Sequence, residues 1–138
     1  MIDYGKYAKA LKHLQVQFGH YQTLDPSLPD FLQEAMAESV IQRFETAYDC
    51  QWKVLKRYLV EELGLPEVPN SPKPVFRLAN ENRLLPAPIE RWLDYANARI
   101  ATAHDYSGEK AGEALALMGD FIQDAIGLYQ RLSGKSWT

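Results

Sequence analysis

The sequence predicts an all-α fold, an up-down four-helix bundle with an additional short helix. Three observations predict it. Apolar residues recur at spacings of three and four along most of the chain, prolines cluster between these stretches, and no stretch alternates as a half-buried strand does. The 138 residues, 46% of them hydrophobic and 24% charged, have the size and balance of one domain spanning residues 1–138.

The first two predicted helices carry the longest apolar stripes. The first begins at about Asp3, a plausible N-cap, and has on one side Tyr4, Tyr7, Leu11, Leu14, Phe18 and, at its end, Tyr21. The second runs from about Ser27 to Leu63, with Pro29 in its first turn, and would span on the order of 50 Å. Its stripe comprises Leu32, Met36, Val40, Phe44, Tyr48, Trp52, Leu55, Leu59 and Leu63. Gly64 suits the position just after its end.

Prolines separate the remaining helices. Residues 65–74 contain four prolines and form the clearest linker. A short helix is predicted to follow from about Pro74 to Leu84 or Leu85. Pro86 and Pro88 then mark the entry to the next helix.

A fourth helix is predicted from Ile89 to about Ala103, and a fifth from about Gly108 to Leu132. The residues expected to face inward on the fourth helix are Ile89, Trp92, Leu93, Ala96 and Ile100. Those on the fifth are Ala111, Leu115, Met118, Phe121 or Ile122, Ala125 and Tyr129. The tail, 133–138, is expected to be frayed. The long second helix and the eight tyrosines leave apolar surface that a symmetric homodimer would cover.

Charge and cysteine content exclude several classes of protein. A net charge of −3 argues against binding of nucleic acid through a broad basic face, so any RNA activity must depend on a local cluster. The single cysteine, Cys50, excludes an intrachain disulfide and is typical of a reducing, cytoplasmic compartment. No secretion signal and no membrane-spanning window is recognised, so a membrane location is not expected.

The stretch Arg-Ile-Ala-Thr-Ala-His-Asp-Tyr, from Arg99 to Tyr106, concentrates the most chemistry. Its spacing, R-x4-H-x-Y, offers a permanent cation, a group that titrates near neutral pH at His104, and a phenol. Arg99 suits bidentate contact with a phosphate and His104 suits proton transfer, a pairing that fits metal-free RNA cleavage with the ribose 2′-oxygen as nucleophile. His13 and His20 lack partners at metal-ligand spacing, so no metal site is predicted.

Helix geometry sets a condition on this site. Positions five apart on an ideal helix are rotated by about 140°, so Arg99 and His104 converge only if the helix ends near Ala103. The turn-forming residues 105–108 favour such an end. The alternative interpretation is structural: His104 caps the helix C-terminus, where a cation is favoured, and Arg99 pairs with a nearby acid. The nearby acids are Glu90, Asp94 and Asp105.

The motif resembles the signature of HEPN domains. Over roughly residues 5–130, the chain is similar to the nucleotidyltransferase substrate-binding proteins, which are grouped with the HepT-type toxins of MntA/HepT systems. Two further segments carry the resemblance. Residues 41–59 include Ile-Gln-Arg-Phe-Glu-Thr-Ala-Tyr followed by Trp-Lys-Val-Leu-Lys-Arg-Tyr-Leu, and residues 89–95 read Ile-Glu-Arg-Trp-Leu-Asp-Tyr.

The resemblance implies a toxin component of a toxin–antitoxin pair. Such proteins are small helical homodimers with a metal-independent endoribonuclease site in a cleft at the dimer interface. The residues carried over are Arg99 and His104, with RNA as substrate and no cofactor. A minimal nucleotidyltransferase encoded nearby forms a complex with the toxin and silences it by transferring AMP to Tyr106. The alternative is a non-catalytic substrate-binding subunit of a two-component nucleotidyltransferase.

The resemblance also implies supporting residues. It places Glu45 and Tyr48 on the long helix beside the same cleft, where Glu45 could orient Arg99 by a charge-assisted hydrogen bond. HEPN motifs commonly carry a polar residue directly after the arginine, whereas this chain has Ile100. Asn97, on the preceding side, is the candidate substitute.

Overall fold

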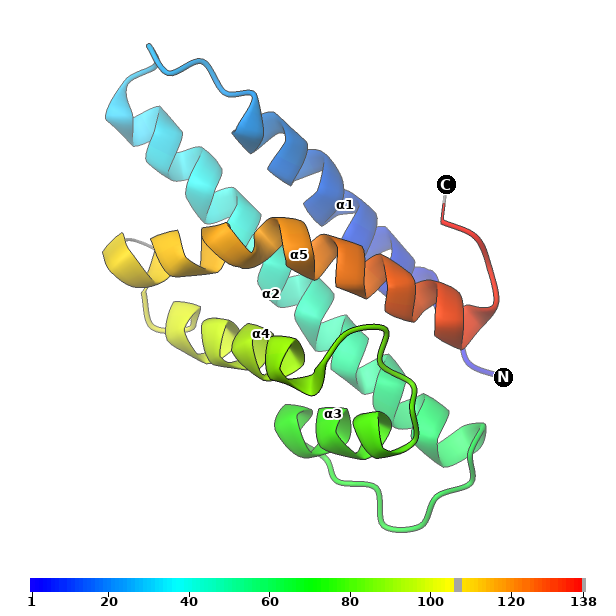
Figure 1. Cartoon of the computed structure of the whole chain (residues 1–138). Helices are drawn as coiled ribbons and strands as arrows, with labels where there is room; N and C mark the ends of the chain where they lie inside the picture. The colour runs from blue at the N-terminus through cyan, green and yellow to red at the C-terminus, as the bar shows by residue number, and fades with distance from the viewer. Residues whose placement is uncertain (106–107, 138) are drawn as a thin grey trace.

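The structure is a computed structural model that describes residues 1–105 and 108–137. The described residues form five α-helices and no β-strand, which confirms the all-α prediction (Figure 1). The additional short helix is the third. No helix in the described part of the chain is both long and apolar enough to cross a membrane. The helices are α1 (Gly5–Gln22), α2 (Asp30–Glu61), α3 (Pro72–Glu81), α4 (Ile89–Thr102) and α5 (Gly108–Ser133).

The longest helix, α2, contacts all four others and organises the fold. Figure 1 shows α1 running alongside α2 in the opposite direction, with α5 crossing over this pair. α4 packs against α5, α3 and α2, and α3 lies beside the C-terminal half of α2 (Figure 1). The motif-bearing helix, α4, therefore lies against the middle of α2.

Aromatic side chains fix α4 in this position. Trp92 on α4 stacks on Phe76 of α3 with ring centroids 5.7 Å apart, and Tyr95 meets Phe121 of α5 edge-on at 5.1 Å. Phe121 in turn meets Phe44 of α2 at 4.9 Å. All five side chains are buried, and each contributes on the order of 1.5–3 kcal/mol through removal from water. These contacts hold the first half of α4 against α3 and α5, and Phe121 links them to α2.

The ends of α2 are set by a proline and a glycine. The helix follows Pro29 and ends shortly before Gly64, whose φ of +62° turns the chain back as expected. The middle of the predicted stripe is buried, but its first and last residues, Leu32 and Leu63, are 43% and 39% exposed. Their inward placement was wrong: Leu32 lies in the first turn of α2, and Leu63 lies beyond the end of this helix at Glu61.

Two other boundaries differ from the prediction. α3 begins at Pro72 rather than Pro74 because prolines are tolerated in the first turn of a helix, so the linker is shorter than 65–74. α1 begins at Gly5, and Asp3 still accepts a hydrogen bond from the Gly5 N–H at 2.8 Å, as an N-terminal cap does.

The described part of the tail is not frayed. Gly134, at φ +72°, turns the chain after α5. Trp137 then packs edge-on against Tyr129 at 5.4 Å, and its indole N–H donates to Gln15 of α1 at 3.2 Å. These two contacts of the indole anchor the tail to α1 and α5. The small polar residues around Trp137 could not do this alone.

Candidate functional site

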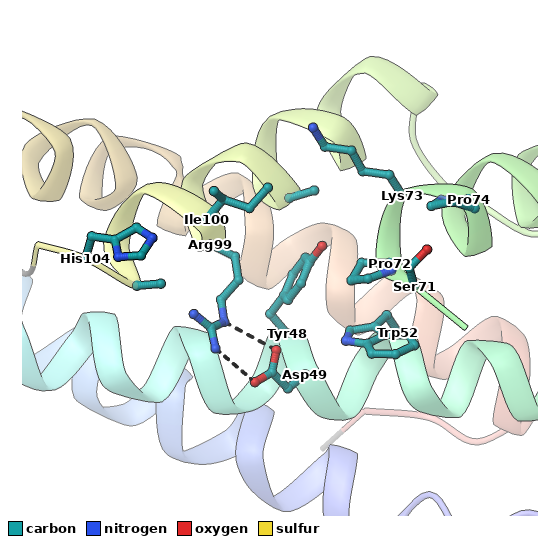
Figure 2. A pocket seen from close by; sticks show the side chains of 12 residues that line it. Tyr48, Asp49, Trp52, Ser71, Pro72, Lys73, Pro74, Arg99, Ile100 and His104 are labelled. Carbon is teal, nitrogen blue, oxygen red and sulfur yellow. Dashed lines mark hydrogen bonds and ion pairs between the residues drawn. The ribbon is translucent and has the colours of Figure 1, made fainter. Parts of the chain in front are cut away.

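A pocket of about 580 Å³ lies between α2, the start of α3 and the end of α4. Both Arg99 and His104 line it. Ala103, just after the end of α4 at Thr102, keeps helical dihedral angles (φ −61°, ψ −25°), so the lining residues of this segment follow one continuous helical face. The helix ends near Ala103 as predicted, but His104 does not turn back toward Arg99, and the two side chains point to different parts of the pocket (Figure 2). The lining residues are Tyr48, Asp49, Trp52, Ser71, Pro72, Lys73, Pro74, Ala96, Arg99, Ile100, Ala103 and His104.

Two carboxylates of α2 hold the Arg99 guanidinium. Its Nε and Nη2 donate to the two oxygens of Asp49 at 3.3 and 3.2 Å, and its Nη1 donates to Glu45 Oε2 at 3.1 Å (Figure 2 draws the Asp49 pair). The predicted hydrogen bond between Glu45 and Arg99 is thus present. The pair with Asp49 was missed. Glu45, Asp49 and Trp52 recur at helical spacing on one face of α2, and this was the signal that a second acid faces the same partner.

The two carboxylates differ in how firmly they are held. The Glu45 side chain is 11% exposed and also accepts a hydrogen bond from the buried Thr102 hydroxyl at 3.0 Å. The Asp49 side chain is 42% exposed. Asp49 can therefore give way to another anion at Arg99 more readily than Glu45. Within the described ranges, no group of three or more His, Cys, Asp or Glu side chains is placed to hold a metal ion.

His104 lies at the end of α4 and is exposed. In Figure 2 it stands at one end of the pocket, while Arg99 reaches across toward α2. The exposed imidazole is therefore accessible both to solvent and to a ligand in the pocket.

Ile100 does not face the core as predicted. It is 58% exposed and lines the pocket. The inner face of α4 follows Ala96, Arg99 and Thr102, one residue away from the expected stripe, because Arg99 finds its partners on α2. The residue after the motif arginine thus presents an apolar side chain to any ligand.

Tyr48 forms part of the pocket wall, as expected from the resemblance. Burial raises the pKa of its phenol, the Asp49 carboxylate raises it further, and Arg99 acts in the opposite direction. The phenol is therefore neutral at physiological pH and keeps its proton for donation.

Two predicted residues do not join this arrangement. Asn97 is not a lining residue of the pocket; its side-chain oxygen accepts a hydrogen bond from Lys73 at 2.6 Å, on the α3 side of α4. This contact links α3 to α4 but does not replace a polar residue beside Arg99. Tyr106 lies outside the described residues.

Comparison with known proteins identifies the family. The profile of the family described as nucleotidyltransferase substrate binding protein like matches residues 2–134. The chain belongs to this family. The nucleotidyltransferase substrate-binding fold is also the fold of the HI0074 protein from Haemophilus influenzae, described as a substrate binding domain of a nucleotidyltransferase. That structure aligns with a TM-score of 0.84 at 23% identity, over 95% of this chain and 99% of that one.

Two further proteins are similar to this chain. A probable ribonuclease HepT of Haemophilus influenzae is 25% identical over 138 residues, which cover 99% of this chain and 92% of the relative. A solved protein of Thermus thermophilus is 31% identical and aligns with a TM-score of 0.72, over 89% of this chain and 98% of that one. The resemblance seen in the sequence is therefore confirmed for the family and for the fold.

Proposed function

We propose that this chain is a HepT-type, metal-independent endoribonuclease that acts through Arg99 and His104. One observation carries the proposal: both residues, at the C-terminal end of α4, line the same pocket. The likeness to a probable ribonuclease HepT over nearly the whole chain supports it.

The chemistry needs only the chain's own residues and the RNA. His104, as the neutral imidazole, takes the proton of a ribose 2′-hydroxyl, and the 2′-oxygen attacks the adjacent phosphorus. The bond from phosphorus to the 5′-oxygen breaks, and that oxygen leaves with a proton from water or from the imidazolium. The products are a 2′,3′-cyclic phosphate and a 5′-hydroxyl. Arg99 binds the phosphate oxygens, displacing Asp49, and stabilises the charge that develops there.

RNA cleavage in the presence of EDTA tests this proposal. The purified chain should degrade single-stranded RNA, while Arg99→Ala and His104→Ala should lose about a hundredfold or more in rate. His20→Ala is the matched control, because His20 is exposed on α1 and does not line the pocket. Circular dichroism verifies the fold of each variant. Activity that persists in His104→Ala, or that EDTA removes, would contradict the mechanism.

The same proposal assigns regulation to a partner. A minimal nucleotidyltransferase encoded nearby binds this chain, itself a homodimer, and transfers AMP to Tyr106. The phenol oxygen attacks the α-phosphorus of ATP and pyrophosphate leaves. Incubation with the partner, ATP and magnesium should add AMP-sized mass increments, which Tyr106→Phe should lose and Tyr21→Phe should keep. Label that persists in Tyr106→Phe would place the acceptor elsewhere.

A second candidate function is a non-catalytic, substrate-binding subunit of the nucleotidyltransferase. Arg99 lies between two carboxylates, and the next residue is the apolar Ile100. Both features weaken phosphate binding and catalysis more than they weaken docking of a partner. If the wild-type chain and both Ala variants are equally inert toward RNA while the complex with the nucleotidyltransferase forms, this second function is the correct one.

A further inference from the structure

The three tryptophans of the chain differ in what their indole N–H groups contact. Trp92 donates to the Ala87 carbonyl at 3.1 Å, and Trp137 donates to Gln15 at 3.2 Å. Trp52 is half-buried on α2 and lines the pocket. In the part of the chain that the structure describes, its N–H is neither sealed in the core nor paired. A ring that faces a pocket with its donor available is able to bind a ligand.

Trp52 lies at the opposite end of the pocket from His104. Figure 2 shows it below Ser71 and Pro72, where α3 begins. It follows Asp49 by three residues on α2, which places the two Cβ atoms about 5–6 Å apart. Because Asp49 contacts the Arg99 guanidinium, the indole is one helical turn from the place where a phosphate would bind.

The charges around the indole favour an anionic ligand. Lys53 Nζ lies 5.9 Å from the centre of the Trp52 ring; Lys73 also lines the pocket, with its ammonium group donating to Asn97 of α4. Asp49 is the acidic residue among the described lining residues, and it shares the Arg99 guanidinium with Glu45. An aromatic platform beside cations is the arrangement that binds single-stranded nucleic acid by stacking its bases.

We propose that the Trp52 end of the pocket is a nucleobase subsite, which holds the base of a nucleotide whose phosphate lies at Arg99. The choice of RNA as ligand rests on the proposed ribonuclease function. The indole stacks on the base, and its N–H donates to a base or ribose oxygen. Since the two carboxylates reduce the attraction of Arg99 for phosphate, base stacking supplies the affinity that the guanidinium alone lacks.

Nuclear magnetic resonance of the three indole N–H groups tests the subsite without any cleavage. The 5′-mononucleotides AMP, GMP, CMP and UMP should shift the Trp52 signal and leave those of Trp92 and Trp137 in place. Ribose 5-phosphate, which has no base, should produce little shift. Equal shifts from ribose 5-phosphate, or no shift of Trp52 with any nucleotide, would overturn the subsite.

Two variants of Trp52 separate stacking from packing. Trp52→Leu keeps apolar volume against the core but removes the aromatic ring, whereas Trp52→Phe keeps a stacking face. Trp52→Leu should raise the KM for single-stranded RNA by about ten- to hundredfold with little change in kcat, and Trp52→Phe should retain most of the affinity. Trp137→Phe is the control for loss of an indole outside the pocket. A similar KM for Trp52→Leu and wild type would overturn the proposal.

The outcomes distinguish this inference from the proposed function. Cleavage of RNA with an unshifted Trp52 signal would refute the nucleobase subsite and leave the ribonuclease standing. Nucleotide binding at Trp52 without cleavage would support the subsite and refute the ribonuclease. A Trp52 shift produced by the nucleotidyltransferase, but by no nucleotide, would refute the subsite in favour of a protein contact.

Discussion

Two arginines on α4, about two helical turns apart, each form an ion pair with a carboxylate on a neighbouring helix. The two clusters differ in how many carboxylates the guanidinium holds by hydrogen bonds. Arg91 donates through Nε and Nη2 to the two oxygens of Asp124 on α5 at 3.0 and 2.9 Å, and the Tyr95 hydroxyl donates to the same carboxylate at 2.5 Å. One buried carboxylate thus receives three hydrogen bonds, while the second carboxylate near Arg91, that of Asp120, lies 3.9 Å away and is 70% exposed.

At Arg99, by contrast, a single guanidinium donates hydrogen bonds to two carboxylates, those of Glu45 and Asp49. The surplus carboxylate, Asp49, is 42% exposed, whereas the Asp124 side chain is 10% exposed. The Arg91 cluster, with its partners satisfied, serves to join α4 to α5. The Arg99 cluster contains a carboxylate that another anion can replace, and it borders a pocket. We infer that function is associated with the incompletely matched cluster.

The largest expected effect follows from breaking the matched cluster. Asp124→Asn should lower the free energy of unfolding by about 2 kcal/mol, below the 3–5 kcal/mol of a fully buried pair, because Arg91 is 43% exposed. The amide has one acceptor oxygen for three donors, and its NH2 group would face other donors. Urea denaturation followed by circular dichroism measures the change.

Asp120→Asn is the matched control for this change. Asp120 lies 3.9 Å from the same guanidinium, is 70% exposed, and should alter the unfolding free energy by less than about 0.5 kcal/mol. Equal losses for the two variants would mean that the cluster acts only through net charge. The contrast between the two arginines would then have no basis in structure.

Local patterns in the sequence predicted the helices, since most of the helix ends are marked by a nearby proline or glycine and each long helix has a regular apolar stripe. They did not predict the inner face of α4. On that short helix, Arg99 and Ile100 are adjacent, and an apolar residue is the natural choice for the core. Arg99 turns inward only because Glu45 and Asp49 meet it, and this depends on how α2 and α4 align in space.

In the candidate site, too, some residues were predicted from the sequence and others depend on how the helices pack. Arg99 and His104 were predicted because their spacing resembles a known motif, and Glu45 because the resemblance places it nearby; Tyr106, from the same motif, stays a prediction. The helical spacing of Asp49 and Trp52 puts them on the same face of α2 as Glu45, but which helices that face meets depends on the packing of α2 against α3 and α4. The docking of Trp137 was missed for a similar reason, since its partners, Gln15 and Tyr129, lie far away in the sequence.

A smaller effect should appear at alkaline pH, through Tyr95. Burial, together with its hydrogen bond to Asp124, raises the pKa of this phenol above the ordinary value of 10.0. The folded state therefore favours the protonated phenol, and its contribution to stability is complete below pH 10 and is lost as the pH rises above that value. Wild type should exceed Tyr95→Phe by about 1 kcal/mol at neutral pH.

This difference should shrink progressively above pH 10. The other tyrosines with raised pKa values, such as Tyr4 at about 12, are present in both proteins, so the difference between them isolates Tyr95. Urea unfolding of both proteins at a series of pH values measures it. A difference that stays constant with pH would show that the Tyr95 phenol is not coupled to the Arg91 cluster.

The smallest expected effect concerns the exchangeable carboxylate, Asp49. Asp49→Asn removes the surplus charge and leaves Arg99 paired with Glu45, so binding of single-stranded RNA should tighten by up to about fivefold at low salt and less at high salt. Fluorescence anisotropy of a labelled RNA measures it. Asp120→Asn is the control, because it changes the net charge by the same amount at a residue of α5 that does not line the pocket. It should tighten RNA binding less than Asp49→Asn does. Equal tightening would assign the effect to net charge, and weaker binding would mean that Asp49 positions Arg99 instead of competing with phosphate.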